Sequence, residues 1–161
     1  MVKSYITKNP SQTRKLGEKL AKEILAGKPR SKEILLRGRS KKTAFIMGLE
    51  GELGGGKTTF LQGFARGLGI KQRVLSPTFV VMKKFRVPSS SVQGFYHIDC
   101  YRIQKTEEIS FLELRKIISM PENIVAIEWA DRIRRVLPIN SMMVKFNFID
   151  KKTRKIIVKY P

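Results

Sequence analysis

The chain has 161 residues, of which 33 are Lys or Arg and 13 are Asp or Glu, so its formal net charge at pH 7 is +20. This length suits one domain with a core of its own, and we predict a single domain over residues 1–161. With 42% hydrophobic and 29% charged residues, the composition excludes a disordered chain. A single cysteine, Cys100, excludes a disulfide framework and a multi-cysteine zinc site. The charge predicts an anionic partner or surface, but neither a fold nor a reaction.

The sequence shows no targeting or membrane segment. The first residues lack an apolar stretch with a small-residue cleavage site, and no apolar run approaches the roughly 20 residues that span a bilayer. We therefore expect a soluble, cytoplasmic protein.

The N-terminal part predicts a strand, a helix and an insertion. A short strand is expected at Lys3–Thr7, and Asn9-Pro10-Ser11 then begins a helix with an apolar face of Leu16, Leu20 and Ile24. Residues 28–42 carry seven Lys or Arg and one Glu, which predicts a solvated basic insertion. A mobile linker and an anion-binding patch are both consistent with this composition.

The rest of the chain alternates apolar runs with helical patterns. Residues 43–49 read as a strand buried on both faces, and an amphipathic helix follows over Lys57–Leu68. A further helix begins at Thr106-Glu107-Glu108, and five more strands are predicted at Phe79–Val87, Phe95–Ile103, Ile124–Glu128, Lys145–Ile149 and Lys155–Tyr160. This order predicts an α/β fold with a mostly parallel central sheet, flanking helices and antiparallel hairpins.

The strongest motif is Gly51-Glu52-Leu53-Gly54-Gly55-Gly56-Lys57-Thr58, which matches G-x-x-x-x-G-K-[ST]. Glycines let successive backbone N–H groups converge on phosphate oxygens, and the positive end of the following helix faces the same anion. In such loops the lysine reaches the terminal phosphates and the hydroxyl ligates Mg²⁺. Because the motif follows an apolar strand and opens an amphipathic helix, it predicts nucleotide binding.

A nucleotide site of this kind also needs a carboxylate for the metal and a polar group near the terminal phosphate. Asp99 and Glu128 each follow a mostly apolar strand, and their local sequences do not choose between them. The segment Ser76-Pro77-Thr78-Phe79 either supplies the hydroxyl or is an ordinary turn.

Three other residues have side chains that could take part in chemistry or binding. His97 fits a structural imidazole better than a base, and Cys100 fits a small core residue. Trp129 fits either packing or a partner contact.

Together these segments resemble the bacterial TsaE family, also called YjeE, the small P-loop ATPases of tRNA threonylcarbamoyladenosine synthesis. The matching pieces are GELGGGKTT (51–59), SPTF (76–79), HIDCYRI (97–103) and IEWADR (127–132). The resemblance is strong over residues 43–138. Gly55 departs from the Ala or Ser that the family commonly has, and the insertion at 28–42 is longer than the family's usual link.

The resemblance implies a P-loop NTPase-like fold and an ATP- and Mg²⁺-dependent ATPase of low intrinsic activity. It would regulate two partners, TsaB-like and TsaD-like proteins, which install threonylcarbamoyl on an adenosine next to the tRNA anticodon, and would not perform that transfer itself. Lys57, Asp99 and Glu128 are implied as catalytic, with Thr58 and Glu128 at the metal. Nucleotide contacts are implied for Gly51, Leu53, Gly54, Gly55, Gly56, Lys57, Thr58, Thr59, Thr78 and Trp129.

Two other functions remain open from the residues alone: a small-molecule or nucleotide kinase, and a nucleic-acid-binding module. The basic charge concentrates in two segments outside the motifs, with net +6 at 28–42 and net +5 at 141–161. We expect these segments to face tRNA or an acidic partner.

Overall fold

The computed structural model describes residues 1–26, 43–76, 82–89, 92–103 and 111–161. The predicted insertion at 28–42, the predicted helix start at Thr106 and the Thr78 side chain lie outside these residues. In chain order the elements are β1 (Val2–Thr7), α1 (Pro10–Leu25), β2 (Phe45–Glu50), α3 (Lys57–Gly67), β3 (Met82–Arg86), β4 (Gly94–Asp99), α4 (Phe111–Ile118), β5 (Asn123–Glu128), the 3₁₀ helix η2 (Ala130–Val136), β6 (Met142–Phe148) and β7 (Arg154–Lys159).

The seven strands form one mixed sheet in the order β1-β7-β6-β2-β5-β4-β3. The central pairs β6–β2, β2–β5 and β5–β4 are parallel, whereas β1–β7, β7–β6 and β4–β3 are antiparallel. The α/β fold and the antiparallel hairpins are therefore confirmed. The sheet is mixed rather than mostly parallel, because the first strand, β1, also pairs antiparallel with β7, in addition to the two predicted hairpins.

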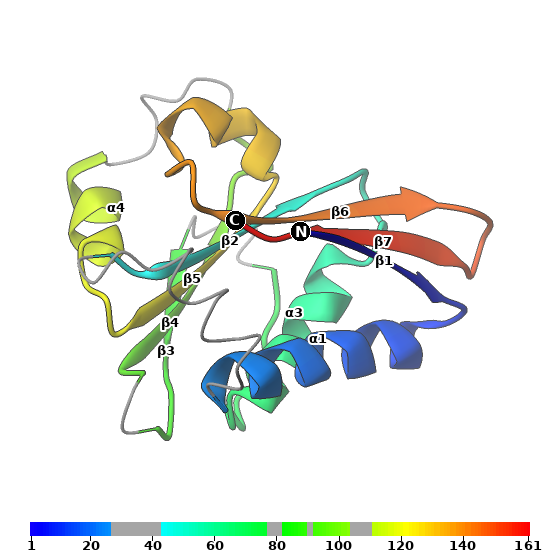
Figure 1. The fold of residues 1–161 in the computed structure, drawn as a ribbon, viewed down its shortest axis with the longest axis horizontal. Helices are drawn as coiled ribbons and strands as arrows, with labels where there is room; N and C mark the ends of the chain where they lie inside the picture. The colour runs from blue at the N-terminus through cyan, green and yellow to red at the C-terminus, as the bar shows by residue number, and fades with distance from the viewer. Residues whose placement is uncertain (27–42, 77–81, 90–91, 104–110) are drawn as a thin grey trace.

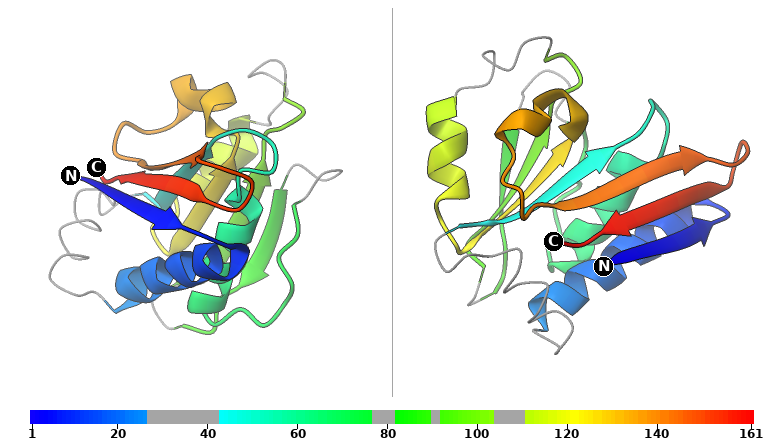
Figure 2. Two further views of the ribbon diagram at one scale, coloured as in Figure 1. Left: turned by 90° about the vertical axis from the view of Figure 1, so that its right-hand side faces the viewer. Right: turned by 45° about the horizontal axis from the view of Figure 1, so that its top comes forward.

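Helices cover both faces of this sheet. In Figures 1 and 2, α1 and α3 lie against one face, and α4 and η2 lie against the other. Two clusters of buried apolar residues correspond to these two faces. Among the described helices, none is long and apolar enough to cross a bilayer.

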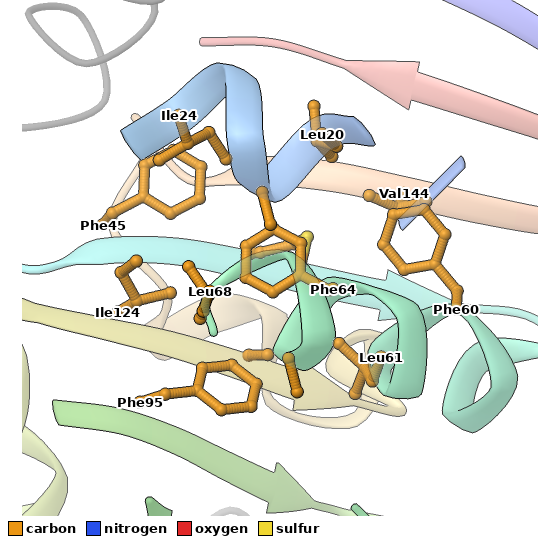
Figure 3. Packing of buried hydrophobic residues seen from close by; sticks show 14 of the residues in the cluster. Leu20, Ile24, Phe45, Phe60, Leu61, Phe64, Leu68, Phe95, Ile124 and Val144 are labelled. Carbon is orange, nitrogen blue, oxygen red and sulfur yellow. The ribbon is translucent and has the colours of Figure 1, made fainter. Parts of the chain in front are cut away.

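The larger cluster fills the space between the sheet and the helices α1 and α3. The predicted apolar stripe of α3 is buried as expected, with Phe60, Leu61 and Phe64 fully covered. Figure 3 shows these side chains among residues of α1 and of the strands, namely Leu20, Ile24, Phe45, Phe95, Ile124 and Val144. The edge-on contact of Phe60 with Phe146, at 5.6 Å between ring centroids, joins α3 to β6. This burial fixes α3 on the sheet.

Glycines bring α1 and α3 together at backbone distance. A Cβ atom at Gly63 would lie 1.9 Å from the carbonyl oxygen of Arg14, and one at Gly17 would lie 2.2 Å from that of Phe60. No side chain fits at either position while the helices keep this separation. The close packing matters for function, because α3 begins with Lys57 and Thr58.

We predict that Gly63→Ala lowers the free energy of unfolding by about 1–3 kcal/mol, as overpacking does, although alanine is the better helix former by about 1 kcal/mol. Arg66→Ala, at an exposed position of the same helix, is the control and should change stability by less than about 0.5 kcal/mol. Urea unfolding of both variants measures the effect. A Gly63→Ala protein as stable as the wild type would contradict the close packing.

Candidate functional site

A glycine-rich loop, Gly51–Gly56, connects the end of β2 to the start of α3. Three of its glycines have positive φ angles: 139° at Gly51, 73° at Gly54 and 100° at Gly56. Gly56 is also the N-cap of α3 and offers no capping side chain. The first amide groups of α3 are therefore available to an external acceptor, which is the property of an anion site at a helix N-terminus.

The loop has little room for side chains at two of its glycines. A Cβ at Gly51 would lie 2.6 Å from the carbonyl oxygen of Phe146 in β6. A Cβ at Gly55 would lie 2.9 Å from the carbonyl oxygen of Glu52, so alanine there would require that carbonyl to shift. The loop conformation seen in this chain thus uses the glycine at position 55.

Lys57 is buried inside the curve of the loop, with 4% of its surface exposed. Its Nζ donates to the carbonyl oxygens of Gly51 at 2.7 Å and Glu52 at 2.9 Å, and it lies 4.0 Å from the centre of the Trp129 ring. Burial lowers the pKa of the Lys57 amine, while the nearby carboxylates, Glu128 foremost, oppose that shift. The ammonium group is therefore held by neutral acceptors next to the loop amides.

Thr58 and Glu128 join α3 to the end of β5. The Thr58 hydroxyl lies 2.9 Å from Oε1 and 3.0 Å from Oε2 of Glu128, so its proton is shared between the two oxygens. Glu128 is 2% exposed, and its Oε1 also lies 2.9 Å from Nε2 of His97 in β4. Of the two carboxylates that the sequence offered, Glu128 is thus the one in contact with the loop hydroxyl.

Asp99 lies at the end of β4, directly beside Glu128 in the parallel register. Its Oδ1 accepts the backbone N–H of Tyr101 at 2.8 Å, and its Oδ2 accepts the Ser76 hydroxyl. The Tyr101 contact forms a local turn, which ends the strand at Asp99 rather than at the predicted Ile103. The two carboxylates therefore meet at one edge of the sheet, each with a hydroxyl partner.

Aromatic side chains form one wall of the site. Trp129 is the only non-glycine residue with positive φ in the described part of the chain, at 58°, and its ring centroid lies 5.1 Å from that of Tyr101. The guanidinium of Arg132 lies 5.4 Å from the Trp129 ring and donates to the carbonyl of Ile103 at 3.0 Å. The unusual backbone at Trp129 turns the chain immediately after Glu128.

The turn between β6 and β7 reaches the opposite side of the loop. Arg154 donates to the carbonyl of Gly54 at 3.3 Å and lies 4.1 Å from the centre of the Phe148 ring. One cation of the basic segment 141–161 is therefore a contact of the loop rather than part of a peripheral patch. The sequence around Arg154 could not indicate this contact, because Arg154 and Gly54 are 100 residues apart.

These groups surround one cavity of about 340 Å³. Its lining includes most of the residues expected from the sequence: Leu53, Gly54, Gly55, Gly56, Lys57, Thr58, Thr59, Asp99, Glu128 and Trp129. Ser76 and Tyr101 also line it, and neither was among the expected nucleotide contacts. A larger cavity of about 680 Å³, lined by segments between Gly69 and Gln93, shares none of these residues.

Comparison with known proteins identifies the family. Residues 7–156 match the family described as threonylcarbamoyl adenosine biosynthesis protein TsaE. The chain belongs to the TsaE family. TsaE of Haemophilus influenzae is 32% identical over 118 residues, covering 73% of this chain and 72% of that protein. TsaE of a Nostoc species is 35% identical over 122 residues, covering 72% of each chain.

The fold agrees with this membership. The crystal structure of YdiB from Bacillus subtilis superposes with a TM-score of 0.66 and 25% identity, covering 99% of this chain and 86% of that one. The TsaE family takes part in tRNA threonylcarbamoyladenosine biosynthesis, which is a tRNA modification, and this favours that function over a kinase or a nucleic-acid-binding module.

Cys100 follows Asp99 directly and is fully buried. Burial, with a smaller contribution from the Asp99 carboxylate, raises the pKa of the Cys100 thiol from 9.0 to about 12. A thiol with a raised pKa is almost entirely protonated at neutral pH, and the thiolate is the reactive form.

We predict that Cys100 reacts with a thiol-specific disulfide reagent at pH 8 at least about 100-fold more slowly in the native protein than in denaturant, because the side chain is fully buried and burial raises its thiol pKa. Since the chain has one cysteine, the colour change reports this residue alone. Native and denatured rates within about tenfold of each other would contradict the burial of Cys100 beside the site.

Proposed function

We propose that the chain binds ATP with Mg²⁺ in the 340 Å³ cavity and hydrolyses it slowly, as the regulatory subunit of the complex that installs threonylcarbamoyl on adenosine next to the tRNA anticodon. The observation that carries the proposal is the convergence of the loop amides, Lys57 and the Thr58–Glu128 pair on this one cavity. The volume lies in the range of small-molecule sites.

In this proposal the glycine loop holds the terminal phosphates. The loop and the N-terminus of α3 direct backbone N–H groups at the anion, and Lys57 supplies a positive charge. The carbonyl oxygens that now accept from Lys57 are replaced by phosphate oxygens, which are stronger acceptors because they are charged. Leu53, Gly54, Gly55 and Thr59 complete the phosphate wall, and Trp129 forms a wall beside the nucleotide.

The side chains at the site fit Mg²⁺. A hydroxyl and a carboxylate are hard oxygen donors, and Mg²⁺ is commonly held by one or two carboxylates together with substrate phosphates and waters. Within the described residues, no group of three His, Cys, Asp or Glu side chains could hold a metal by itself. The proposal therefore assigns Thr58 and Glu128 to the metal only together with the nucleotide. When bound, Mg²⁺ neutralises charge on the terminal phosphates.

Asp99 is proposed to orient the water that attacks the terminal phosphate or to support the metal. It lines the cavity and is 8% exposed, and its carboxylate already accepts two hydrogen bonds that fix its direction. Ser76 places a hydroxyl next to it, in the segment where the sequence predicts the polar group near the terminal phosphate. Thr78 stays a prediction for the same segment.

The proposed slow turnover is supported by the kinds of residue that line the cavity. Among the described residues that line it, none is an arginine. Arg132 and Arg154, which contact lining residues, donate to the main-chain carbonyls of Ile103 and Gly54. An arginine supplied to the transition state accelerates phosphoryl transfer by orders of magnitude. We therefore propose that the TsaB-like and TsaD-like partners in the cytoplasm complete the site, with tRNA bound by the assembly.

We predict that Lys57→Ala weakens ATP binding about 10- to 100-fold, the effect of losing a charge-assisted hydrogen bond. Isothermal titration calorimetry with ATP and Mg²⁺ measures it. Lys15→Ala, at an exposed position of α1, removes the same charge away from the site and should leave the affinity unchanged.

Two results would contradict the proposal. One is equal ATP affinity of the wild type and Lys57→Ala. The other is ATP hydrolysis by the isolated wild type at the roughly 10 s⁻¹ of a typical enzyme, which would contradict a regulatory role that depends on partners.

A further inference from the structure

His97 is the only histidine of the chain and is completely buried in β4. Its Nε2 lies 2.9 Å from Oε1 of Glu128 on the neighbouring strand β5. Because an ionised carboxylate only accepts hydrogen bonds, the imidazole is the donor, and the proton resides on Nε2. The ring therefore approaches the carboxylate from within the sheet, whereas Thr58 approaches it from α3.

Metal binding would affect the hydrogen bonds that Thr58 and His97 make with Glu128 differently. A Thr58 hydroxyl that gives a lone pair to a metal keeps one O–H and must reorient it, so its proton is no longer shared between both Glu128 oxygens. The contact with His97 does not involve a metal ligand other than Glu128 itself. Its donor has no other task at the metal, so this hydrogen bond can fix the direction of the carboxylate both with and without the metal.

Packing alone does not account for His97. Its Nδ1 is buried and has no hydrogen-bond partner among the described residues, and leaving a polar atom unpaired in the interior is unfavourable. An apolar side chain of similar size would fill the same volume without that cost. The presence of an imidazole here is therefore explained by the hydrogen bond that Nε2 donates to Glu128.

We propose that His97 is a positioning residue for Glu128: its Nε2–H holds the carboxylate in the orientation that receives the Mg²⁺ of a bound nucleotide. The inference rests on the proposed function and adds a residue to it. Groups that orient metal ligands in this way commonly change metal affinity by about 10- to 100-fold when they are removed.

The test compares two substitutions of similar length, His97→Gln and His97→Met. The glutamine amide can donate from near the position of Nε2, whereas the methionine thioether cannot donate. Mn²⁺, which is paramagnetic, is titrated into protein saturated with ATP, and the free ion is measured by electron paramagnetic resonance. ATP affinity in EDTA is measured separately by calorimetry, so that the metal and phosphate contacts are read independently.

We expect His97→Met to weaken Mn²⁺ binding at least tenfold and His97→Gln to stay within about threefold of the wild type, following the effect of second-layer groups on metal sites. ATP affinity without metal should change less than about twofold in both variants, because the phosphate contacts are untouched. Phe95→Leu, a buried substitution on the same strand that does not contact the site, should leave Mn²⁺ affinity unchanged.

Three results would overturn the inference: wild-type Mn²⁺ affinity in His97→Met, loss of affinity in a folded His97→Gln equal to that in His97→Met, or the same loss in Phe95→Leu. If His97→Met does not fold by circular dichroism, His97→Asn replaces it, since its shorter amide does not reach Glu128. Failure of the proposed function is recognised separately, because the wild type would then bind no ATP.

Discussion

Two charged side chains buried at the mouth of one cavity impose the main constraint on this structure. Lys57 and Glu128 are 4% and 2% exposed, and a buried charge is unfavourable unless other groups compensate it. The fold gives each of them hydrogen-bond partners of its own. Lys57 donates to two loop carbonyls and faces an indole ring, while Glu128 accepts from Thr58 and His97. Each group thus keeps contacts that a charged ligand can replace.

The sheet and the helix pair bring these groups together. β2, β5 and β4 are parallel, so the glycine loop, Glu128 and Asp99 all follow strand ends at one edge of the sheet. The helix α3, which carries Lys57 and Thr58, is held against α1 at backbone distance through Gly63 and Gly17. The helix that carries Thr58 to Glu128 is thus held by contacts that lie outside the cavity lining.

Local patterns predicted the elements better than their pairing. The apolar stripe of α3 and the loop motif were both evident, because each is encoded within about a dozen consecutive residues. The antiparallel share of the sheet was underestimated because β1 pairs with β7, at the other end of the chain, and no local signal encodes that pairing. Local sequence did not choose between Asp99 and Glu128 for the same reason, since the contact of Glu128 with Thr58 joins residues 70 positions apart; the family resemblance alone favoured Glu128.

The side-chain contacts around the motif could not be predicted from the sequence either. His97 was expected to be a structural imidazole, and only the strand register places its ring beside Glu128. Arg154 was counted with a peripheral basic segment, and only the β6–β7 turn brings it to Gly54. Side chains that support a site from neighbouring strands have no spacing rule, because their separation along the chain depends on the connections between the strands.

We propose that the cavity of this TsaE-family protein is a Mg²⁺–ATP site whose nucleotide cycle sustains tRNA modification. The most direct measurement is reconstituted modification with the TsaB-like and TsaD-like proteins, counting the threonylcarbamoyl groups transferred to tRNA per complex. We expect many rounds with the wild type and a stop after about one round with Lys57→Ala and with Glu128→Ala, because both variants lose groups proposed to hold the nucleotide and its metal. Repeated rounds at the wild-type rate in both variants would contradict it.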